Sequence, residues 1–457
     1  EKDLTEAESK NITDLGIKGL TVFRERARSY PAGSLAAHVL GFVGEGGAGA
    51  PGLSGKYGVE KKFETILARE PEGKLVNFFA ELFAGVSGAI KKSEIGDVVL
   101  TIEPSVQAEL ERELVDVSSK WKAKRAAGII IDPNTGAIRA MGATPSFDPG
   151  NYFNTEDVSN FSNPLVESVF EMGSIIKPLT MAAGIDSGAV TATSTYHDYG
   201  FVIVNNAKLK NSDGKGNGVV DMQTILAKSL NTGAVFVEQK MGNDTFRKYM
   251  LSFGLGEKSG IDLPGDVNGL VKNLSSTRDI EYATASFGQG IALSPIQVVR
   301  ALSAIANGGV LIRPHVVESI VRSNGEVETT PVENAGRVIS EKASKAITEM
   351  LTKAVDITLA NGKAKLVDYS IAAKTGTAQI SNNNGGGYSE DRFLHTFFGY
   401  FPATKPQYLI FLLLEEPKGV DYSSETLTAP FSKLVKYLIH YYGMEPDRTE
   451  TPAQIKP

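Results

Sequence analysis

The sequence predicts an α+β fold: an antiparallel sheet, flanked by helices and interrupted by a helical insert, next to a small irregular N-terminal module. The apolar runs Gly128–Ile131 and Ala137–Met141 flank a segment of turn-forming residues, as a β-hairpin requires. Much further along the chain, Phe393–Tyr400 and Tyr408–Leu414 flank a second turn that contains proline. Because helical patterns fill most of the sequence between these pairs, we expect the sheet to be built from both ends of its domain.

The N-terminal module differs in composition from the rest of the chain. Residues 1–96 are rich in glycine and charge, and Gly41–Gly58 contains so many turn formers that we expect no regular element there. Apolar residues then predict a strand over 98–102, and Pro104 opens a helix with apolar residues at helical spacing. We therefore predict two domains, residues 1–96 and residues 97–457.

The helix expected over 295–307 shows how elements of the insert are delimited. Ser294 is suited to cap its start, Pro295 fits its first turn, and Gly308-Gly309 ends it. A last helix presents one apolar face, made of Phe431, Leu434, Val435, Leu438 and Ile439. In the first helix Ile296, Val299, Leu302 and Ile305 recur at helical spacing, so both helices have an apolar face to bury.

Composition and charge exclude several classes of function. The chain has 457 residues with 47 Lys and Arg against 53 Asp and Glu, and its net charge of −6 disfavours binding to nucleic acid. Its 42% apolar and 22% charged content is typical of globular domains. Cysteine is absent and the five histidines never occur at metal-binding spacing, so we expect no metal and no cofactor.

No segment has the length and apolar character of a membrane span. The longest apolar run, Tyr408–Leu414, is far shorter than the roughly 20 residues that a bilayer requires. Glu1 is followed by charged residues rather than by a signal-peptide core. We expect that the chain as given neither spans a membrane nor carries its own export signal.

With no cysteine or histidine pattern to activate a nucleophile, lysine is the remaining strong base, which directs attention to Ser-x-x-Lys. In this pattern the two side chains share one face of a helix. Three copies occur, at Ser119/Lys122, Ser174/Lys177 and Ser212/Lys215. About one or two copies are expected by chance in a chain of this length, so any single copy is more often a solvated surface pair.

The Ser174/Lys177 copy is distinguished by its context. Gly173 precedes the helix start, Pro178 is tolerated only in the first turn, and the following residues are apolar enough to bury the lysine. A lysine with the ordinary pKa of about 10.4 is charged at neutral pH, so a lysine base must be desolvated or lie near other cations. The helix N-terminus also offers N–H groups to an oxyanion that forms beside Ser174.

A second cation lies in the strand-like run 372–378. Here Lys374 precedes Thr375, Gly376 and Thr377, and an ordinary edge strand is the alternative explanation. The ammonium group and the two hydroxyls would bind a carboxylate, and the glycine would let the backbone of a ligand approach. The N–H of Thr377 could complete an oxyanion hole.

The pattern Ser-x-Asn occurs three times, but only Ser229/Asn231 falls between Ser174 and Lys374. This ordered set of motifs resembles that of penicillin-binding proteins and serine β-lactamases. Similarity over most of the chain is to class B penicillin-binding proteins, the monofunctional peptidoglycan D,D-transpeptidases of elongation and division. The resembling segments are GDVVLTIEPSVQAELE, AGIIIDPNTGAIRAM, EMGSIIKP, KSLNTGAVF, ASFGQGIALSPIQ, AKTGTAQ and HTFFGYFPATKPQY, with YPAGSLAAHVLGFVG and GKYGVEKKFETIL in the first module.

The resemblance implies the penicillin-recognising serine transpeptidase fold and a role for each motif. Ser174 would be the acylated nucleophile, and Lys177 would take its proton. Ser229 would relay a proton toward the leaving amine, and Asn231 would hydrogen-bond the bound stem peptide. β-Lactams would acylate the same serine. Lys374, Thr375 and Thr377 would hold the terminal carboxylate of D-Ala-D-Ala. Together with Gly376 they form the strand that would bind the substrate.

The resemblance also implies a location and partners. The family usually opens with a transmembrane anchor and an Arg-Gly-x-Ile-x-Asp-Arg-type segment, and neither occurs here, so the chain looks like an ectodomain without its anchor. Residues 1–96 resemble a membrane-proximal pedestal and are too few for a glycosyltransferase domain. We expect the protein to act at the outer face of the bacterial cell membrane. Its ligands are expected to be stem peptides and β-lactams, and its partner a lipid-linked glycan polymerase.

Two other functions remain open at this stage. A serine β-lactamase or penicillin-sensing receptor would share the three motifs, although the sequence lacks a Glu-x-x-Leu-Asn segment to activate a deacylating water. A catalytically silent cell-wall scaffold would bind through residues 1–96, but it would have no need of Ser174, Lys177 and Lys374 together.

The loop Ser381–Glu390 directly follows the Lys-Thr-Gly strand. Its start is rich in asparagine and glycine, which is typical of flexible loops. We expect it to be mobile and to gate the cleft, and a passive surface loop is the alternative.

Overall fold

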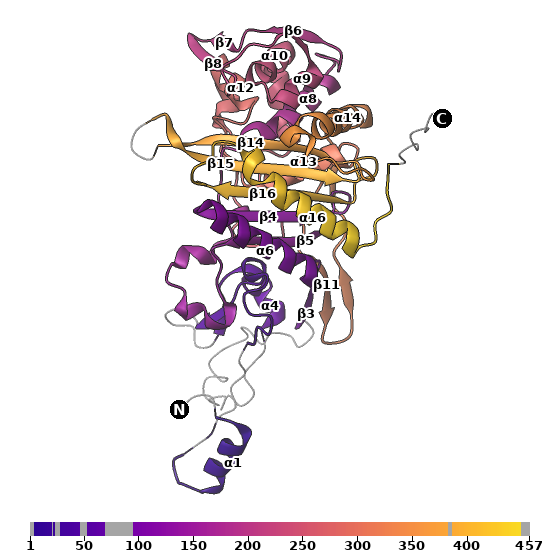
Figure 1. Ribbon diagram of the computed structural model, residues 1–457. Coiled ribbons are helices and arrows are strands. Elements are labelled where there is room, and N and C mark those ends of the chain that lie inside the picture. The colour runs from indigo at the N-terminus through magenta and orange to yellow at the C-terminus, as the bar shows by residue number, and fades with distance from the viewer. Residues whose placement is uncertain are drawn as a thin grey trace, which may run out of the picture.

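A five-stranded antiparallel sheet lies at the centre of the computed structural model, which describes residues 4–20, 22, 28–45, 53–68, 95–382 and 386–448 (Figure 1). Its strand order is β14-β15-β16-β4-β5, and neighbouring strands are antiparallel throughout. The strands are β4 (Arg125–Ile131), β5 (Ile138–Thr144), β14 (Ala372–Ser381), β15 (Tyr388–Phe401) and β16 (Tyr408–Glu415). The prediction that both ends of the domain build the sheet is confirmed.

Helices cover both faces of this sheet. Alternate strand residues point to opposite faces, so each apolar strand contributes to two separate cores. One face buries residues such as Ile130 and Phe397 under α6 (Pro104–Trp121) and α16 (Thr428–Tyr441), which cross the sheet in Figure 1. The other face buries its apolar residues under three helices of the insert, α8 (Lys177–Asp186), α13 (Pro295–Ala306) and α14 (Glu341–Ile357). The α+β prediction is therefore confirmed.

The insert between β5 and β14 is mainly helical, and its helices α8, α9 (Met222–Lys228), α10 (Asn231–Met241) and α12 (Asp279–Ala285) lie in the upper part of Figure 1. The predicted helix over 295–307 is α13, which Ser294 opens with a reciprocal capping box and which ends at Ala306, just before Gly308-Gly309. No helix of the described residues is long and apolar enough to cross a bilayer. Other α-helices of the insert are α7 (Pro164–Glu167) and α11 (Asn243–Ser252). Its paired strands include β6 (Thr195–Asp198), β7 (Phe201–Val204), β8 (Ala207–Lys210), β9 (Gly218–Asp221), β10 (Val310–Ile312) and β13 (Asn334–Arg337).

The expectation of no regular element in Gly41–Gly58 is wrong. Two short strands pair there in antiparallel register, and residues 46–52 lie outside the described residues. Gly41 has φ 71°, and a Cβ on it would lie 1.9 Å from the Tyr57 carbonyl oxygen, so glycine permits the close approach of the two segments. The elements of the N-terminal module are α1 (Glu6–Asp14), α2 (Ala37–Leu40), β1 (Val43–Glu45), β2 (Leu53–Gly55), α3 (Gly58–Lys62) and α4 (Glu64–Leu67).

The strand expected over 98–102 forms slightly earlier, as β3 (Gly96–Leu100), and it does not join the main sheet. It pairs with β11 (Val317–Arg322), which also pairs with β12 (Val327–Thr329). A local pattern predicts a strand but carries no information on a partner this far away in sequence.

Aromatic residues join the N-terminal module to the rest of the protein. The ring of Phe42 stacks on Tyr152 at 4.2 Å between centroids and meets Phe161 edge-on at 4.9 Å. The backbone N–H of Ala36 donates to the Glu111 carboxylate of α6 at 2.8 Å. The module therefore packs on the main domain through both apolar and polar contacts.

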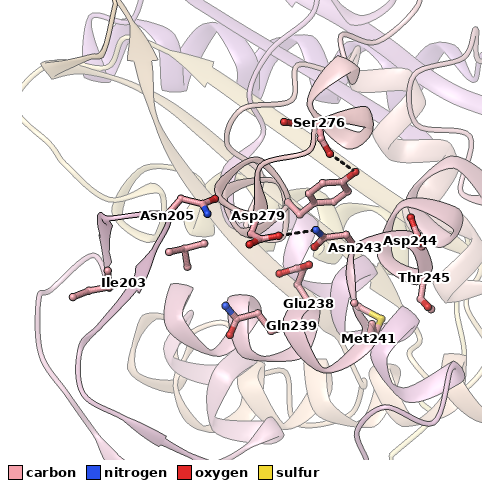
Figure 2. Close-up of a pocket in the computed structure, with 13 residues that line it drawn as sticks. Ile203, Asn205, Glu238, Gln239, Met241, Asn243, Asp244, Thr245, Ser276 and Asp279 are labelled. Carbon is pink, nitrogen blue, oxygen red and sulfur yellow. Dashed lines mark hydrogen bonds between the residues drawn. The ribbon is translucent and has the colours of Figure 1, made fainter.

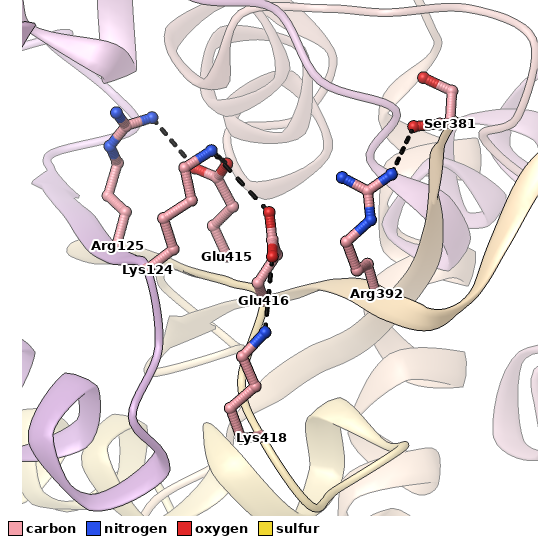
Figure 3. Close-up of polar contacts among 7 residues, drawn as sticks. All are labelled: Lys124, Arg125, Ser381, Arg392, Glu415, Glu416 and Lys418. Carbon is pink, nitrogen blue, oxygen red and sulfur yellow. Dashed lines mark hydrogen bonds and ion pairs between the residues drawn. The ribbon is translucent and has the colours of Figure 1, made fainter. Parts of the chain in front are cut away.

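Ion pairs fix one end of the central sheet, as Figure 3 shows. Glu415, at the end of β16, pairs with Lys124 at 2.6 Å and with Arg125 at 3.0 Å. Lys418 pairs with Glu416 at 3.5 Å, and nearby Arg392 donates to the Ser381 carbonyl at 3.2 Å. Because Glu415 lies opposite Arg125 in the strand register, these charges favour the observed pairing of β16 with β4.

Replacing Leu110 in α6 by alanine tests the core beneath this helix. Leu110 is 0% exposed, and its truncation is expected to lower the free energy of unfolding by about 2–5 kcal/mol. Val115→Ala is the matched control, because Val115 is 51% exposed on the same helix and should change stability by roughly 0.5 kcal/mol or less. Urea unfolding followed by circular dichroism measures both, and equal effects would contradict the packing described above.

Candidate active site

Ser174 and Lys177 lie where a short 3-10 turn runs into a helix. The turn η4 (Gly173–Ile176) leads directly into α8, and the Lys177 N–H donates to the Ser174 carbonyl. Pro178 occupies the first turn of α8, where no intrahelical donor is lost. The Ser174 side chain is half-buried whereas Lys177 is only 1% exposed. The predicted pairing of an accessible alcohol with a buried amine is therefore present.

The edge strand β14 runs beside this turn, and two glycines allow the approach. A Cβ on Gly173, which has φ 62°, would lie 2.9 Å from the Thr377 carbonyl oxygen. A Cβ on Gly376 would lie 2.3 Å from Thr396 Oγ1 and 2.8 Å from the Met172 carbonyl oxygen. Both contacts are closer than side chains tolerate, so glycine is needed for the strand and the serine turn to meet.

Ser229 and Asn231 enter from the turn between α9 and α10. Ser229 ends α9 in the left-handed conformation, with φ 58°, and Asn231 is the first residue of α10. This turn directs two oxygens at the Lys177 ammonium group: the Ser229 carbonyl at 2.6 Å and Asn231 Oδ1 at 2.7 Å. The Asn231 amide in turn donates to the Lys210 carbonyl at 2.9 Å, which fixes its orientation.

The hydroxyl of Ser229 lies between two ammonium groups. Its Oγ is 3.2 Å from Lys177 Nζ and 3.0 Å from Lys374 Nζ. Lys374 Nζ also donates to the Thr375 carbonyl at 3.0 Å. A hydroxyl can accept two hydrogen bonds and still donate one, so the proton of Ser229 can point toward a ligand while both lysines hold its oxygen. All three motifs therefore meet at one point.

Burial shifts the titration of both lysines. Removal from water, together with the charge of Lys374, holds the pKa of Lys177 well below its ordinary range. Burial alone lowers the pKa of Lys374 to about 7. The lowered pKa makes Lys177 easier to deprotonate than an ordinary lysine, which is the property that a lysine base requires.

The Lys177 amine makes its hydrogen bonds with residues of the Ser229 turn. Among the described residues, its hydrogen bonds go to Ser229 and Asn231, and none joins it to the Ser174 hydroxyl. Helical spacing gives only the shared face, whereas the oxygens of the distant Ser229 turn set the final orientation. Catalytic hydrogen bonds often tighten only when substrate is bound.

Thr377 is supported by residues that the sequence motifs do not reveal. The N–H of Ser423 donates to Thr377 Oγ1 at 3.1 Å, which leaves the hydroxyl proton of Thr377 available to a ligand. Ser423 is itself held by its hydroxyl bond to the Thr396 carbonyl at 2.7 Å and by Thr426, which lies 3.0 Å from the buried His395 ring. No local pattern singles out these residues, because their role depends on the pairing of β14 with β15 and on the chain that follows β16.

The loop after the Lys-Thr-Gly strand is described only at its ends. Residues 383–385 lie outside the described residues, so its gating role stays a prediction. At the described end, the Tyr388 hydroxyl donates to Glu171 at 2.9 Å, and the Gly290 N–H donates to the same carboxylate at 3.1 Å. These bonds connect the start of β15 to the segment that precedes Ser174.

The other two Ser-x-x-Lys copies lie apart from this site. Ser119 and Lys122 occupy the exposed C-terminal end of α6, and Ser212 and Lys215 lie in a turn after β8. Within the described part of the chain, no three metal-ligating side chains come together.

The chain is similar in sequence and in structure to known proteins. The family described as "Penicillin binding protein transpeptidase domain" matches residues 126–436. Stage V sporulation protein D of Bacillus subtilis is 30% identical over 98% of this chain and 69% of its own length. Peptidoglycan D,D-transpeptidase FtsI of Escherichia coli is 27% identical over 96% of this chain and 71% of its own length. The apo crystal structure of penicillin-binding protein 3 from Mycobacterium tuberculosis has a TM-score of 0.79 at 25% identity and covers 92% of both chains.

The fold and these relationships define a serine-type acyltransferase. The chain belongs to the penicillin-binding protein transpeptidases, and among them to class B. Its activity is that of a peptidoglycan D,D-transpeptidase. The resemblance seen in the sequence is thereby confirmed for family, fold and reaction.

Replacing Lys374 by methionine tests the burial of its charge. The pKa in the folded protein, about 7, lies below the ordinary lysine value, so the unfolded chain binds more protons between about pH 7 and 10. This group therefore makes stability increase with pH across that window. We expect Lys374→Met to raise the melting temperature most at about pH 6, with a gain that shrinks toward about pH 10.

Lys342→Met, at an exposed position of α14, is the control and should shift the melting temperature equally at every pH. Differential scanning calorimetry of the three proteins gives the comparison. A Lys374→Met shift that does not depend on pH would show that this lysine titrates normally.

Proposed function

We propose that Ser174 forms the acyl-enzyme of this transpeptidase and that the two buried lysines divide the chemistry between them. The observation that carries the proposal is the Ser229 hydroxyl, which lies within hydrogen-bond distance of Lys177 and of Lys374. A base, a proton relay and a carboxylate-binding cation thus share one connected group of atoms next to an accessible serine.

Acylation begins when Ser174 Oγ attacks the carbonyl carbon between the two terminal D-alanines of a stem peptide. Neutral Lys177 accepts the hydroxyl proton as the new C–O bond forms. The N–H groups of Ser174 and Thr377 stabilise the oxyanion of the tetrahedral intermediate. Ser229 donates its proton to the leaving nitrogen and regains one from Lys177, so the C–N bond breaks and D-alanine leaves as a neutral amine.

The second half-reaction reverses these proton transfers. An amine from a neighbouring stem peptide attacks the ester carbonyl, and its proton passes through Ser229 to Lys177. The C–O bond to Ser174 then breaks, and the serine oxygen takes a proton back from Lys177. The new amide is the cross-link, and the site returns to its starting protonation state.

Recognition of the substrate is proposed to rest on its terminal carboxylate. Lys374 supplies a cation, Thr375 and Thr377 supply hydroxyl donors, and Gly376 leaves space for the peptide backbone. Asn231 would donate to a carbonyl of the stem peptide while its Oδ1 holds Lys177. A β-lactam carries an equivalent carboxylate next to a strained amide, so we propose covalent inhibition at Ser174; the M. tuberculosis relative has been crystallised with aztreonam.

We propose that residues 1–96 form a membrane-proximal pedestal and residues 97–457 the transpeptidase domain. The packing of Phe42 on Tyr152 and Phe161 supports a fixed rather than a flexible connection. The protein is proposed to act at the outer face of the bacterial cell membrane, where its substrate is found, beside a lipid-linked glycan polymerase that supplies the strands to be cross-linked.

Replacing Ser174 by alanine tests the nucleophile. Penicillin should add one covalent equivalent to the wild-type protein and none to Ser174→Ala, because the other hydroxyl beside the buried lysines, that of Ser229, accepts hydrogen bonds from both of them and serves as the proton relay rather than as the nucleophile. Intact-mass spectrometry followed by peptide mapping locates the adduct. Ser119→Ala, which removes the serine of an exposed Ser-x-x-Lys copy, should keep the full adduct, and an adduct that persists on Ser174→Ala would refute the assignment.

The stability of the adduct separates a transpeptidase from a β-lactamase. The described site provides two lysines and a serine but no carboxylate hydrogen-bonded to them to activate a deacylating water. We expect one rapid equivalent of nitrocefin hydrolysis followed by hours without turnover. A stopped-flow trace with a linear phase of many turnovers would instead favour the lactamase function.

A further inference from the structure

A large open cavity lies at the end of α10 away from the catalytic residues (Figure 2). Its volume is about 830 Å³, which is within the range of sites for small molecules. It is bounded by the end of α10, the start of α11, the start of α12 and the tip of the β7–β8 hairpin. The proposed mechanism uses none of these residues.

The floor of the cavity contains a buried carboxyl group, one oxygen of which has no hydrogen-bond partner among the described residues. Glu238 of α10 is only 1% exposed, and its Oε1 has no hydrogen bond within the described structure. In Figure 2 its carboxyl group points to the hydrogen bond between Asp279 and Asn243. Buried polar side chains are normally paired, so an unpaired carboxyl oxygen beside an open cavity points to a ligand that could supply a hydrogen-bond donor.

The surroundings of Glu238 are acidic. Three of the residues that line the cavity are Asp or Glu, and none is Lys, Arg or His. Asp279 stands at the rim with its carboxylate held by the Asn243 amide at 3.0 Å. Burial, and then the charge of Asp279, raise the pKa of Glu238 to about 7, and a positive group placed between these two carboxyls would favour their ionised forms.

We propose that this cavity binds an organic cation, an ammonium or guanidinium group, between Glu238 and Asp279. The neighbouring amide and hydroxyl groups of Asn205, Asn243 and Thr245 offer acceptors for the remaining N–H donors. A divalent metal fits less well, because hard cations require six or more oxygen ligands and no cluster of three ligating side chains occurs in the described residues.

The cavity is separate from the catalytic residues, although Glu238 and Asn231 share a helix. Glu238 lies seven residues after Asn231 on α10, which places it about 10 Å further along the helix axis. The inference therefore does not depend on the proposed function. A ligand in the cavity should bind equally to free and to penicillin-treated protein.

Methyl NMR can test the proposal, because Met241 and Ile203 line the cavity and carry reporter methyl groups. Methylguanidinium and n-butylammonium are titrated separately, with sodium and magnesium chloride as references. We expect saturable shifts of both methyl signals with at least one organic cation and none with either salt. The two titrations distinguish a guanidinium from an ammonium ligand.

Glu238→Gln keeps the shape of the side chain and removes its charge, so it should weaken binding about tenfold or more. Asp279→Asn, at an exposed position, gives a second variant without any change to the core. Glu341→Gln, whose side chain is 79% exposed on α14, is the matched control and should bind as the wild type does. Penicillin acylation should be unchanged in all three variants.

Three results would overturn the proposal: no saturation with either organic cation, equal saturation with magnesium, or wild-type affinity in both cavity variants. A failure of penicillin to acylate Ser174 would refute the proposed catalytic role but would leave this titration unaffected. The two proposals can therefore fail independently.

Discussion

The arrangement of the active site depends on a single hydroxyl group, that of Ser229, which is held between two buried amines. Ser229 Oγ is the point at which Lys177 and Lys374 meet, and within the described part of the chain neither amine is hydrogen-bonded to a carboxylate. Burial disfavours ammonium groups that have no carboxylate partner, and this lowers the pKa of both lysines. Because two buried ammonium groups close together are unfavourable, Lys177 loses its proton more easily and can act as the base.

The fold brings these groups together from distant parts of the chain. Lys177 and Ser229 are separated by 52 residues, and Ser229 and Lys374 by 145. The serine turn opens the helical insert, the α9–α10 turn lies within it, and β14 returns from it to the edge of the sheet. Glycines at 173 and 376 let the turn and the strand approach, because any side chain there would meet backbone oxygen. The edge strand of the sheet thus holds Lys374 in place beside residues that come from the helical insert.

Local sequence patterns predicted most helices and strands well, but they did not predict which distant segments these helices and strands contact. Ser294 and the glycines after Ala306 delimit α13 because caps are encoded within a few residues. The Gly41–Gly58 hairpin was missed, because three-residue strands carry too little alternation to be recognised and are stabilised by glycine contacts across the pair. The motifs placed three groups of residues together, but the turn of Lys177 toward Ser229 and the support of Thr377 by Ser423 depend on tertiary contacts.

The pH dependence of acylation tests the central claim most directly. The second-order rate constant for a β-lactam reports the groups of the free enzyme. It should rise as Lys177 loses its proton and fall as Lys374, whose pKa is about 7, loses the charge that binds the carboxylate, which gives a bell-shaped profile. A rate constant that still increases at about pH 10 would mean that both amines titrate as ordinary lysines. The account of two coupled buried lysines would then be wrong.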